Sequence, residues 1–134
     1  MQPHAIITGA NAGLGFQTAR LALANGYELT MAVRDFDKGK RAVIELKEEF
    51  PNALIHLKHL ELHDIKSVRA FAESISKWEL LINNAGAKIE KPYKQTAQGF
   101  EWHIGVNHLG HFALTALLWP KSSTNACVVT VSSI

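Results

Sequence analysis

Short apolar runs alternate along this chain with longer segments in which apolar residues recur every three or four positions. The short runs are typical of β-strands, and the longer segments are typical of amphipathic helices. We expect five strands, at 5–8, 28–33, 53–60, 80–83 and 126–131, with four helices between them. Strands that alternate with helices predict a parallel sheet that is covered by helices.

The ends of the four helices carry recognisable signals. The first helix is expected at 14–24 and the second near 37–50, because Gly26 can take a left-handed cap conformation and Pro51 cannot continue a helix. Asp64 and Thr96 are predicted to cap the third and fourth helices. The fourth helix is expected to run toward Pro120.

All 134 residues are expected to form one domain, because no linker, repeat or low-complexity tract interrupts the pattern. The predicted fold class is α/β, with a doubly wound parallel sheet of strand order 3-2-1-4-5. The first, fourth and fifth strands are nearly all apolar, as are central strands that are buried on both faces. The sequence stops directly after the fifth strand, so we expect a fold that is truncated there and has an open edge.

Composition narrows the classes of function. Apolar residues make up 47% of the chain and charged residues 19%, as in ordinary globular proteins. Basic residues exceed acidic residues by only 14 − 12 = 2 and are scattered, so the footprint of a nucleic-acid-binding protein is absent from the sequence. No apolar run approaches the ~20 residues that span a bilayer, and no signal-peptide pattern opens the chain. We therefore expect no nucleic-acid partner and no membrane partner.

Cys127 is the only cysteine of the chain. A single thiol cannot form an internal disulfide, which fits a reducing compartment, so we expect a cytoplasmic location. Because Cys127 lies in an apolar run, we predict that it is a core residue rather than a reactive one.

A glycine-rich segment, TGANAGLG at 8–15, follows the first strand and opens the first helix. Gly9 would permit a tight turn, Gly13 would let the backbone approach a pyrophosphate, and Gly15 would let helix and strand pack closely. The N-terminus of the helix would offer N–H groups to phosphate oxygens. The alternative is a plain strand-to-helix turn, and the spacing of the glycines differs from the usual dinucleotide fingerprint.

Three further segments accompany this loop: LLINNAGA at 80–87, NHLGHFALT at 107–115 and VVTVSS at 128–133. Together, in this order, they resemble the short-chain dehydrogenase/reductase family. The strings NHLGHF and AVRDFDKG are similar to its retinol-dehydrogenase-like and WW-domain-oxidoreductase-like branch. The resemblance covers the whole chain and implies the N-terminal half of a Rossmann-fold oxidoreductase. Such an enzyme reduces a carbonyl or oxidises an alcohol with a nicotinamide cofactor.

The end of the second strand bears on the choice of cofactor. NAD-type members of the family usually carry an Asp where this chain has Val33, and the next residue is Arg34, whose guanidinium suits a 2′-phosphate. We therefore expect NADP(H) as the cofactor. Asn11 could assist Arg34, whereas Ala12 stands where strongly NADP-preferring members carry a basic residue. The alternative is that Arg34 pairs with Asp35 or Asp37 at the surface.

The resemblance assigns further cofactor-binding residues. Glu61 stands where the family commonly has an Asp that bonds the adenine amino group. Asn84 is expected to tie the central strands together. The full predicted set of cofactor-binding residues is Gly9, Asn11, Gly13, Leu14, Gly15, Arg34, Leu60, Glu61, Leu62, Asn83, Ala85 and Gly86.

Two catalytic positions of the family are matched. Ser133 matches the serine that bonds the substrate oxygen, and Asn107 matches the helical asparagine that anchors a proton-relay water. The alternatives are a turn serine and a helix-packing amide. The family's Tyr-x-x-x-Lys is not in the sequence, since neither Tyr27 nor Tyr93 is followed by Lys four residues later. We expect this chain to bind cofactor and to turn over little or nothing.

The remaining expectations concern ligands and partners. The substrate would be a small carbonyl compound or alcohol, and only residues 88–93 and Trp102 could contribute to its pocket from this half. No metal is expected, because the seven histidines lack a completing ligand set. A homo-oligomer is expected, since the open edge and the fourth helix leave apolar surface uncovered. The alternative to an enzyme is a non-enzymatic NADP-binding or regulatory module that pairs with another chain.

Overall fold

The protein forms one five-stranded parallel sheet with helices on both faces. The computed structural model describes residues 2–87 and 92–132. The strand order β3-β2-β1-β4-β5 confirms the predicted topology. The strands are β1 (His4–Thr8), β2 (Glu28–Val33), β3 (Ile55–His59), β4 (Trp78–Asn83) and β5 (Ser122–Thr130).

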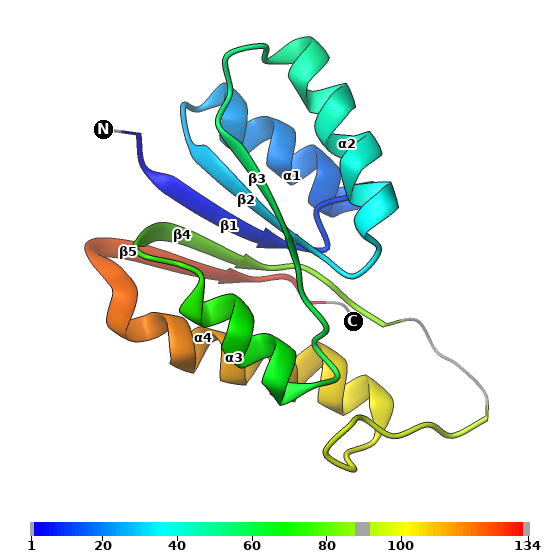
Figure 1. Cartoon of the computed structure of the whole chain (residues 1–134). Helices are drawn as coiled ribbons and strands as arrows, with labels where there is room; N and C mark the ends of the chain where they lie inside the picture. Colours follow the sequence, from blue (N-terminus) through cyan, green and yellow to red (C-terminus); the bar gives the residue numbers. More distant parts are fainter. Residues whose placement is uncertain (1, 88–91, 133–134) are drawn as a thin grey trace.

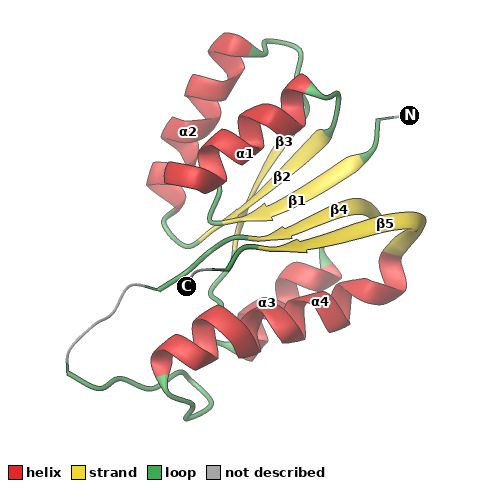
Figure 2. Ribbon diagram, turned by 180° about the vertical axis from the view of Figure 1, so that it is seen from behind, coloured by secondary structure: helices red, strands yellow, loops and turns green. Residues whose placement is uncertain are grey.

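The helices form two outer layers. α1 and α2 cover one face of the sheet, and α3 and α4 cover the other, so the fold is doubly wound (Figures 1 and 2). The helical elements are α1 (Gly13–Ala24), α2 (Phe36–Glu49), α3 (Ile65–Glu73), the π-helix η1 (Ile104–Gly110), α4 (His111–Leu118) and the 3-10 turn η2 (Trp119–Lys121). The carboxylates of Asp35 and Asp64 accept the backbone N–H of Lys38 and Lys66 and cap α2 and α3. The predicted cap of the third helix is thus confirmed.

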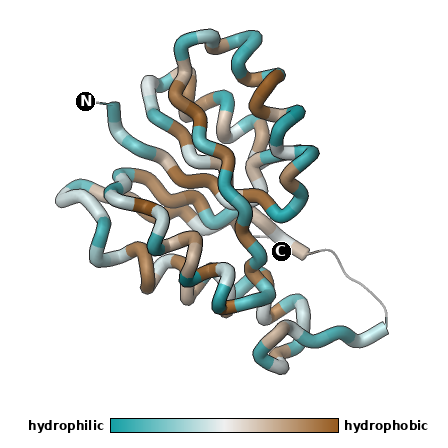
Figure 3. Tube along the Cα trace, in the orientation of Figure 1, coloured by the Kyte–Doolittle hydropathy of each residue, from teal (hydrophilic) through white to brown (hydrophobic). Residues whose placement is uncertain are grey.

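Two apolar cores lie on the two faces of the sheet. Successive residues of β1 point to opposite faces, so Ala5 and Ile7 pack with α1 and α2, whereas Ile6 packs with α3 and α4. All three are fully buried. Figure 3 shows hydrophobic residues along the central strands and many hydrophilic residues on the outer helix α2. This packing holds the carboxyl ends of the strands at one rim of the sheet.

β5 is an edge strand, and one of its faces is open. Ala126 and Val128 pack toward α3 and α4. Cys127 and Val129, on the opposite face, are exposed. The predictions that Cys127 is a core residue and that β5 is buried on both faces were therefore wrong. The apolar run correctly indicates a strand. Whether both faces of that strand are buried depends on the elements that pack beside it.

The segment before Pro120 is not one continuous α-helix with Thr96 at its cap. Thr96 is buried, and its hydroxyl accepts the N–H of Phe100 in a turn. The helix begins later, where the Glu101 carboxylate accepts the N–H of His103 and of Ile104, at 2.8 and 3.2 Å. The hydrogen bond from His103 lowers the pKa of Glu101 below its ordinary value. The prediction for Thr96 was wrong because a carboxylate five residues later satisfies these N–H groups instead.

Within the described residues, no helix is long and apolar enough to cross a membrane.

Candidate functional site

A cavity of about 540 Å³ opens at the carboxyl ends of the parallel strands. The loops that follow β1, β2, β3 and β4 all contribute to its lining, and η1 closes one side. The chain leaves β1 and β4 toward opposite faces of the sheet, so the cavity lies at the topological switch point. Ligands of open α/β sheets bind in this crevice. The predicted residues that line it are Gly9, Asn11, Gly13, Arg34, Leu60, Glu61, Leu62, Ala85 and Gly86.

The glycine loop bends sharply after β1. Gly9 has a φ of +65°, and a Cβ there would lie 2.9 Å from the Cα of Ala85. A Cβ on Gly15 would collide with the carbonyl oxygen of Gly9 and with the side-chain amide of Asn84. Both positions therefore demand glycine for packing, as the sequence predicted for the turn and for the helix contact.

Gly13 faces open space. Its φ is +57°, and no atom lies within 4 Å of a Cβ built there. Ala12, which has no side-chain acceptor, occupies the N-cap position of α1. The first turn of a 12-residue helix thus directs its N–H groups and the positive end of its dipole toward the cavity. This geometry fits a phosphate or pyrophosphate group.

Charged side chains gather at the β2 and β3 end of the cavity. Arg34 Nε lies 3.5 Å from Glu61 Oε2, so Arg34 pairs with Glu61 rather than with Asp35 or Asp37. The Glu61 carboxylate also lies close to two histidine rings, with His59 Nε2 3.2 Å from Oε1 and His63 Nε2 2.8 Å from Oε2. Lys38 of α2 lines the same end of the cavity.

Trp102 lies at this same end. It is buried, and its ring stacks on the His63 ring with centroids 4.9 Å apart. The Arg34 guanidinium and the Lys94 ammonium lie 5.6 and 3.9 Å from the Trp102 centroid. Trp102 therefore lies beside Arg34 and lines the cavity. Of the other residues considered for the substrate pocket, Lys88–Lys91 lie outside the described residues, and Tyr93 is exposed.

The end of β1 is joined to the end of β4 and to α4 by a buried hydroxyl. Thr8 Oγ1 accepts the N–H of Asn84 and of Ala85, each at 2.9 Å. It also lies 2.8 Å from His111 Nε2, so its own proton is donated to the imidazole. The side-chain amide of Asn84 donates to the carbonyl oxygens of Thr8 and Gly9. The structural role predicted for Asn84 is confirmed, and Asn84 also lines the cavity.

His111 is held as the neutral form by its surroundings. Its Nδ1 lies 3.1 Å from the carbonyl oxygen of Asn107, which can only accept, so Nδ1 carries the proton and Nε2 accepts from Thr8. Burial lowers the pKa of His111 below its ordinary value, although the bond to Asn107 acts in the opposite direction.

Three predicted cofactor-binding residues lie outside the cavity lining. Gly15 is buried beneath the loop, and Leu14 is 63% exposed and does not line the cavity. Asn83 is buried between β4 and α4, where its side-chain amide donates to Thr115 Oγ1 at 3.1 Å. A strand alternates its side chains between two faces, and Asn83 falls on the face that is covered by α4.

The structure describes one of the two predicted catalytic residues, Asn107, but not the other, Ser133. Asn107 lies in η1, and its Oδ1 accepts the N–H of Ala87 at 2.6 Å. It is exposed at the mouth of the site beside Gly86. A π-helical turn widens the backbone and is frequent at functional sites. Ser133 lies outside the described residues.

Sequence reasoning missed Lys38, His63 and Thr8 as contributors to this region. Lys38 lies four residues after Arg34, and this spacing at the start of a helix was the available signal. The position of His63 depends on stacking with Trp102, 39 residues away in the sequence, which no local pattern shows. Among the described residues, no group of three or more His, Cys, Asp or Glu side chains could hold a metal ion.

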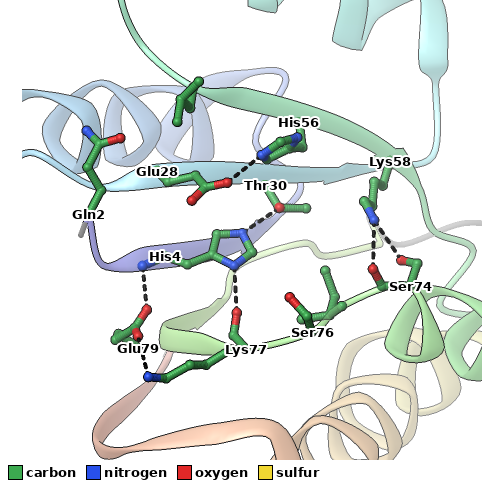
Figure 4. Close-up of a pocket in the computed structure, with 12 residues that line it drawn as sticks. Gln2, His4, Glu28, Thr30, His56, Lys58, Ser74, Ser76, Lys77 and Glu79 are labelled. Carbon is green, nitrogen blue, oxygen red and sulfur yellow. Dashed lines mark hydrogen bonds and ion pairs between the residues drawn. The ribbon is translucent and has the colours of Figure 1, made fainter.

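A second cavity, of about 430 Å³, lies at the opposite, amino ends of the strands. Figure 4 shows that its polar side chains point toward one another. His56 Nε2 lies 2.6 Å from Glu28 Oε1, the His4 ring contacts Thr30, and Lys58 donates to Ser74. Because these groups satisfy each other, they are accounted for by packing without a ligand.

Comparison with known proteins agrees with the fold. The human protein retinol dehydrogenase 12 is 47% identical over 135 residues, which cover 96% of this chain and 42% of that protein. A solved structure of an uncharacterised protein from Mycobacterium paratuberculosis has a TM-score of 0.82 and 46% identity, covering 91% of this chain and 43% of that one. A short-chain dehydrogenase/reductase from Burkholderia phymatum, solved in complex with NAD, has a TM-score of 0.79 and 26% identity, covering 98% and 49%.

The chain spans less than half the length of these relatives. The high identity to retinol dehydrogenases confirms the resemblance to that branch. The model of the family described as short chain dehydrogenase matches residues 3–134. This protein therefore belongs to the short-chain dehydrogenase family of oxidoreductases.

Proposed function

We propose that this chain is the NADP(H)-binding half of an oxidoreductase that interconverts a small carbonyl compound and an alcohol. The single observation that carries the proposal is the cavity at the switch point, which has a glycine loop at one end and Arg34 at the other. Its residues fit a dinucleotide, because Gly13 leaves open space at a helix N-terminus where a pyrophosphate is stabilised. The related protein solved with NAD supports the cofactor class.

The choice of NADP(H) over NAD(H) rests on Arg34 and Lys38. Both line the cavity at the end of β2, where the adenosine ribose lies in dinucleotide folds. The planar fork of Arg34 can hold a phosphate through two hydrogen bonds, and Lys38 adds a second positive charge. Asn11 lines the same cavity and could donate to the same phosphate.

The residues of this chain would orient the reaction rather than complete it. The bound cofactor would supply or accept the hydride. Asn107 Oδ1 holds the segment after β4 through Ala87 N–H, which fixes the floor beside Gly86. Ser133 is proposed to bond the substrate oxygen, as the family pattern implies. These 134 residues contain no Tyr-x-x-x-Lys, the motif that would donate a proton to the alkoxide. We therefore propose that this chain alone gives no detectable turnover.

Binding measurements test the proposal directly. NADPH should bind more tightly than NADH, and Arg34→Ala should remove most of the difference, since one charge-assisted contact contributes about 1.5 to 3 kcal/mol. The measurement is a fluorescence titration of both cofactors. Equal affinities in the unmutated chain would overturn the assignment of Arg34.

A non-enzymatic NADP-binding or regulatory module is the second candidate. The observation in its favour is the exposed apolar surface at Phe112 and Trp119, through which such a module would pair with another chain. The mass of the protein in its native cells distinguishes the two: a chain about twice as long supports the enzyme, whereas a chain of this length that binds NADPH without turnover supports the module.

We also propose that the chain forms homo-oligomers and is located in the cytoplasm. Exposed Phe112 and Trp119 on the α4 side, together with the open face of β5, offer apolar surface for a second copy. The lone Cys127 is compatible with a reducing compartment. Cell fractionation with an antibody tests the location.

A further inference from the structure

The residue proposed to hold the 2′-phosphate is already paired with an acid. Arg34 follows β2 and Glu61 follows β3, and because these strands are neighbours, both side chains reach the same rim of the cavity. Arg34 Nε lies 3.5 Å from Glu61 Oε2. Within the described residues, Glu61 Oε2 is buried and accepts no well-directed hydrogen bond. The pair is held mainly by charge, so a stronger anion can take the place of the carboxylate.

Two histidines contact the Glu61 carboxylate, and a third contact anchors the backbone of Glu61. His63 Nε2 lies 2.8 Å from Oε2 and His59 Nε2 lies 3.2 Å from Oε1. The backbone N–H of Glu61 donates to Ser67 Oγ at 2.9 Å. The carboxylate is therefore held against the cavity and cannot move away from an incoming phosphate without losing these contacts.

Arg34 has a second contact that does not depend on Glu61. Its guanidinium lies 5.6 Å from the centroid of the buried Trp102 ring, which is stacked on His63. Loss of the charge on Glu61 would leave Arg34 beside this ring, at the same end of the cavity. The charge of Glu61 can therefore be changed without removing the guanidinium from the site.

We propose that Glu61 is a specificity-determining residue that competes with the 2′-phosphate of NADP(H) for Arg34. The inference rests on the proposed function, because it takes Arg34 as the phosphate ligand. A phosphate dianion at Arg34 meets the negative charge of Glu61, whereas an unphosphorylated ribose meets no such repulsion and can donate its hydroxyls to the carboxylate. Glu61 thus lowers the preference of this chain for the phosphorylated cofactor.

The test compares two ligands that differ only in the phosphate at issue. The 134-residue chain is titrated with adenosine 2′,5′-bisphosphate and with adenosine 5′-monophosphate by calorimetry, and the ratio of their dissociation constants is measured. Glu61→Gln keeps an oxygen that can accept from adenine but removes the charge. It should raise the preference for the bisphosphate, measured as the ratio of the two dissociation constants, by about three- to tenfold.

A double-mutant cycle shows whether Glu61 acts through Arg34. In the Arg34→Ala background, Glu61→Gln should raise the ratio by less than it does in the unmutated chain. An equal gain with and without Arg34 would overturn competition for the guanidinium. Asp37→Asn removes an acid in the first turn of α2 and controls for net charge; it should leave the ratio unchanged.

The two proposals fail in different ways. If Arg34→Ala abolishes the preference for the bisphosphate but Glu61→Gln does not raise it, this inference is overturned and the proposed function stands. If Arg34→Ala leaves the preference unchanged, the assignment of Arg34 fails. Glu61→Asp, which retracts the charge by one methylene, is a second variant in case Glu61→Gln does not fold, and it should give a smaller gain; a loss of preference would contradict the inference.

Discussion

The hydroxyl of Thr8 lies 2.8 Å from Nε2 of His111, across 103 residues of sequence. The same oxygen accepts two backbone N–H groups from the segment that follows β4. One hydroxyl therefore joins the start of the glycine loop, the floor of the cavity and α4. Because all these groups lie in or near the buried interior, the loss of any one partner leaves polar atoms without hydrogen bonds.

Replacement of Thr8 by valine tests this junction. Thr8→Val keeps the shape of the side chain but removes an acceptor for two N–H groups and a donor for His111. We expect the free energy of unfolding to fall by about 2 to 4 kcal/mol. Urea denaturation followed by circular dichroism measures the change. Thr8→Ser is the matched control, since it retains the hydroxyl; if both variants lose the same stability, the methyl group rather than the hydrogen bonds is responsible.

The stability of the protein should depend on pH through His111. Burial lowers the pKa of His111 in the folded state, so the unfolded chain binds the proton more readily. Stability is therefore fully present above the unfolded pKa of about 6.5 and decreases as pH falls below it toward the folded pKa, by at most about 1.4 kcal/mol per pH unit.

Urea midpoints at pH 7.5 and pH 5 measure this loss. His111→Gln has no titrating ring but retains an oxygen that can accept from Thr8, so its midpoint should fall less between the two pH values. Parallel losses in both proteins would show that other groups, such as the remaining histidines, account for the pH dependence.

Gly13 should be essential for dinucleotide binding but not for folding. Gly13→Val places a side chain in the open space where the pyrophosphate is expected, and we predict that binding of NADPH is lost. Gly26→Val is a matched control, because Gly26 also has a positive φ, of +82°, and also faces open space, at the other end of α1. Both variants should lose about 1 to 2 kcal/mol from backbone strain, with their helical circular dichroism retained. Retained NADPH binding by Gly13→Val would place the cofactor elsewhere.

Self-association should proceed through exposed side chains on the α4 side of the molecule. Phe112 and Trp119 are 68% and 62% exposed. The double variant Phe112→Glu, Trp119→Glu should sediment as a smaller species than the unmutated chain over a range of concentrations. Leu21→Glu, at a side chain on α1 that is 64% exposed, is the control. A monodisperse unmutated monomer would contradict the proposal of a homo-oligomer.

The alternation of strands and helices, the order of the strands and the place of the glycine loop could all be predicted from the sequence. Each of these depends on residues close together in the chain: the apolar runs of β1 and β4, and the glycines that allow the turn at Gly9 and the contact at Gly15. Because crossover connections are right-handed and short, only a few arrangements of the sheet are possible. The cavity at the switch point follows from the same rules.

The partners of the polar side chains and the faces that stay exposed could not be predicted from the sequence, because they depend on contacts that form only in the folded chain. Arg34 pairs with Glu61 because two parallel strands end side by side, and Cys127 is exposed because none of the helices among the described residues covers its face of β5. The cap at Glu101 and the π-helix that follows it likewise differ from the continuous helix that the local pattern indicated. These features depend on contacts between residues far apart in the chain. Local propensities differ by only small free energies, so such contacts override them.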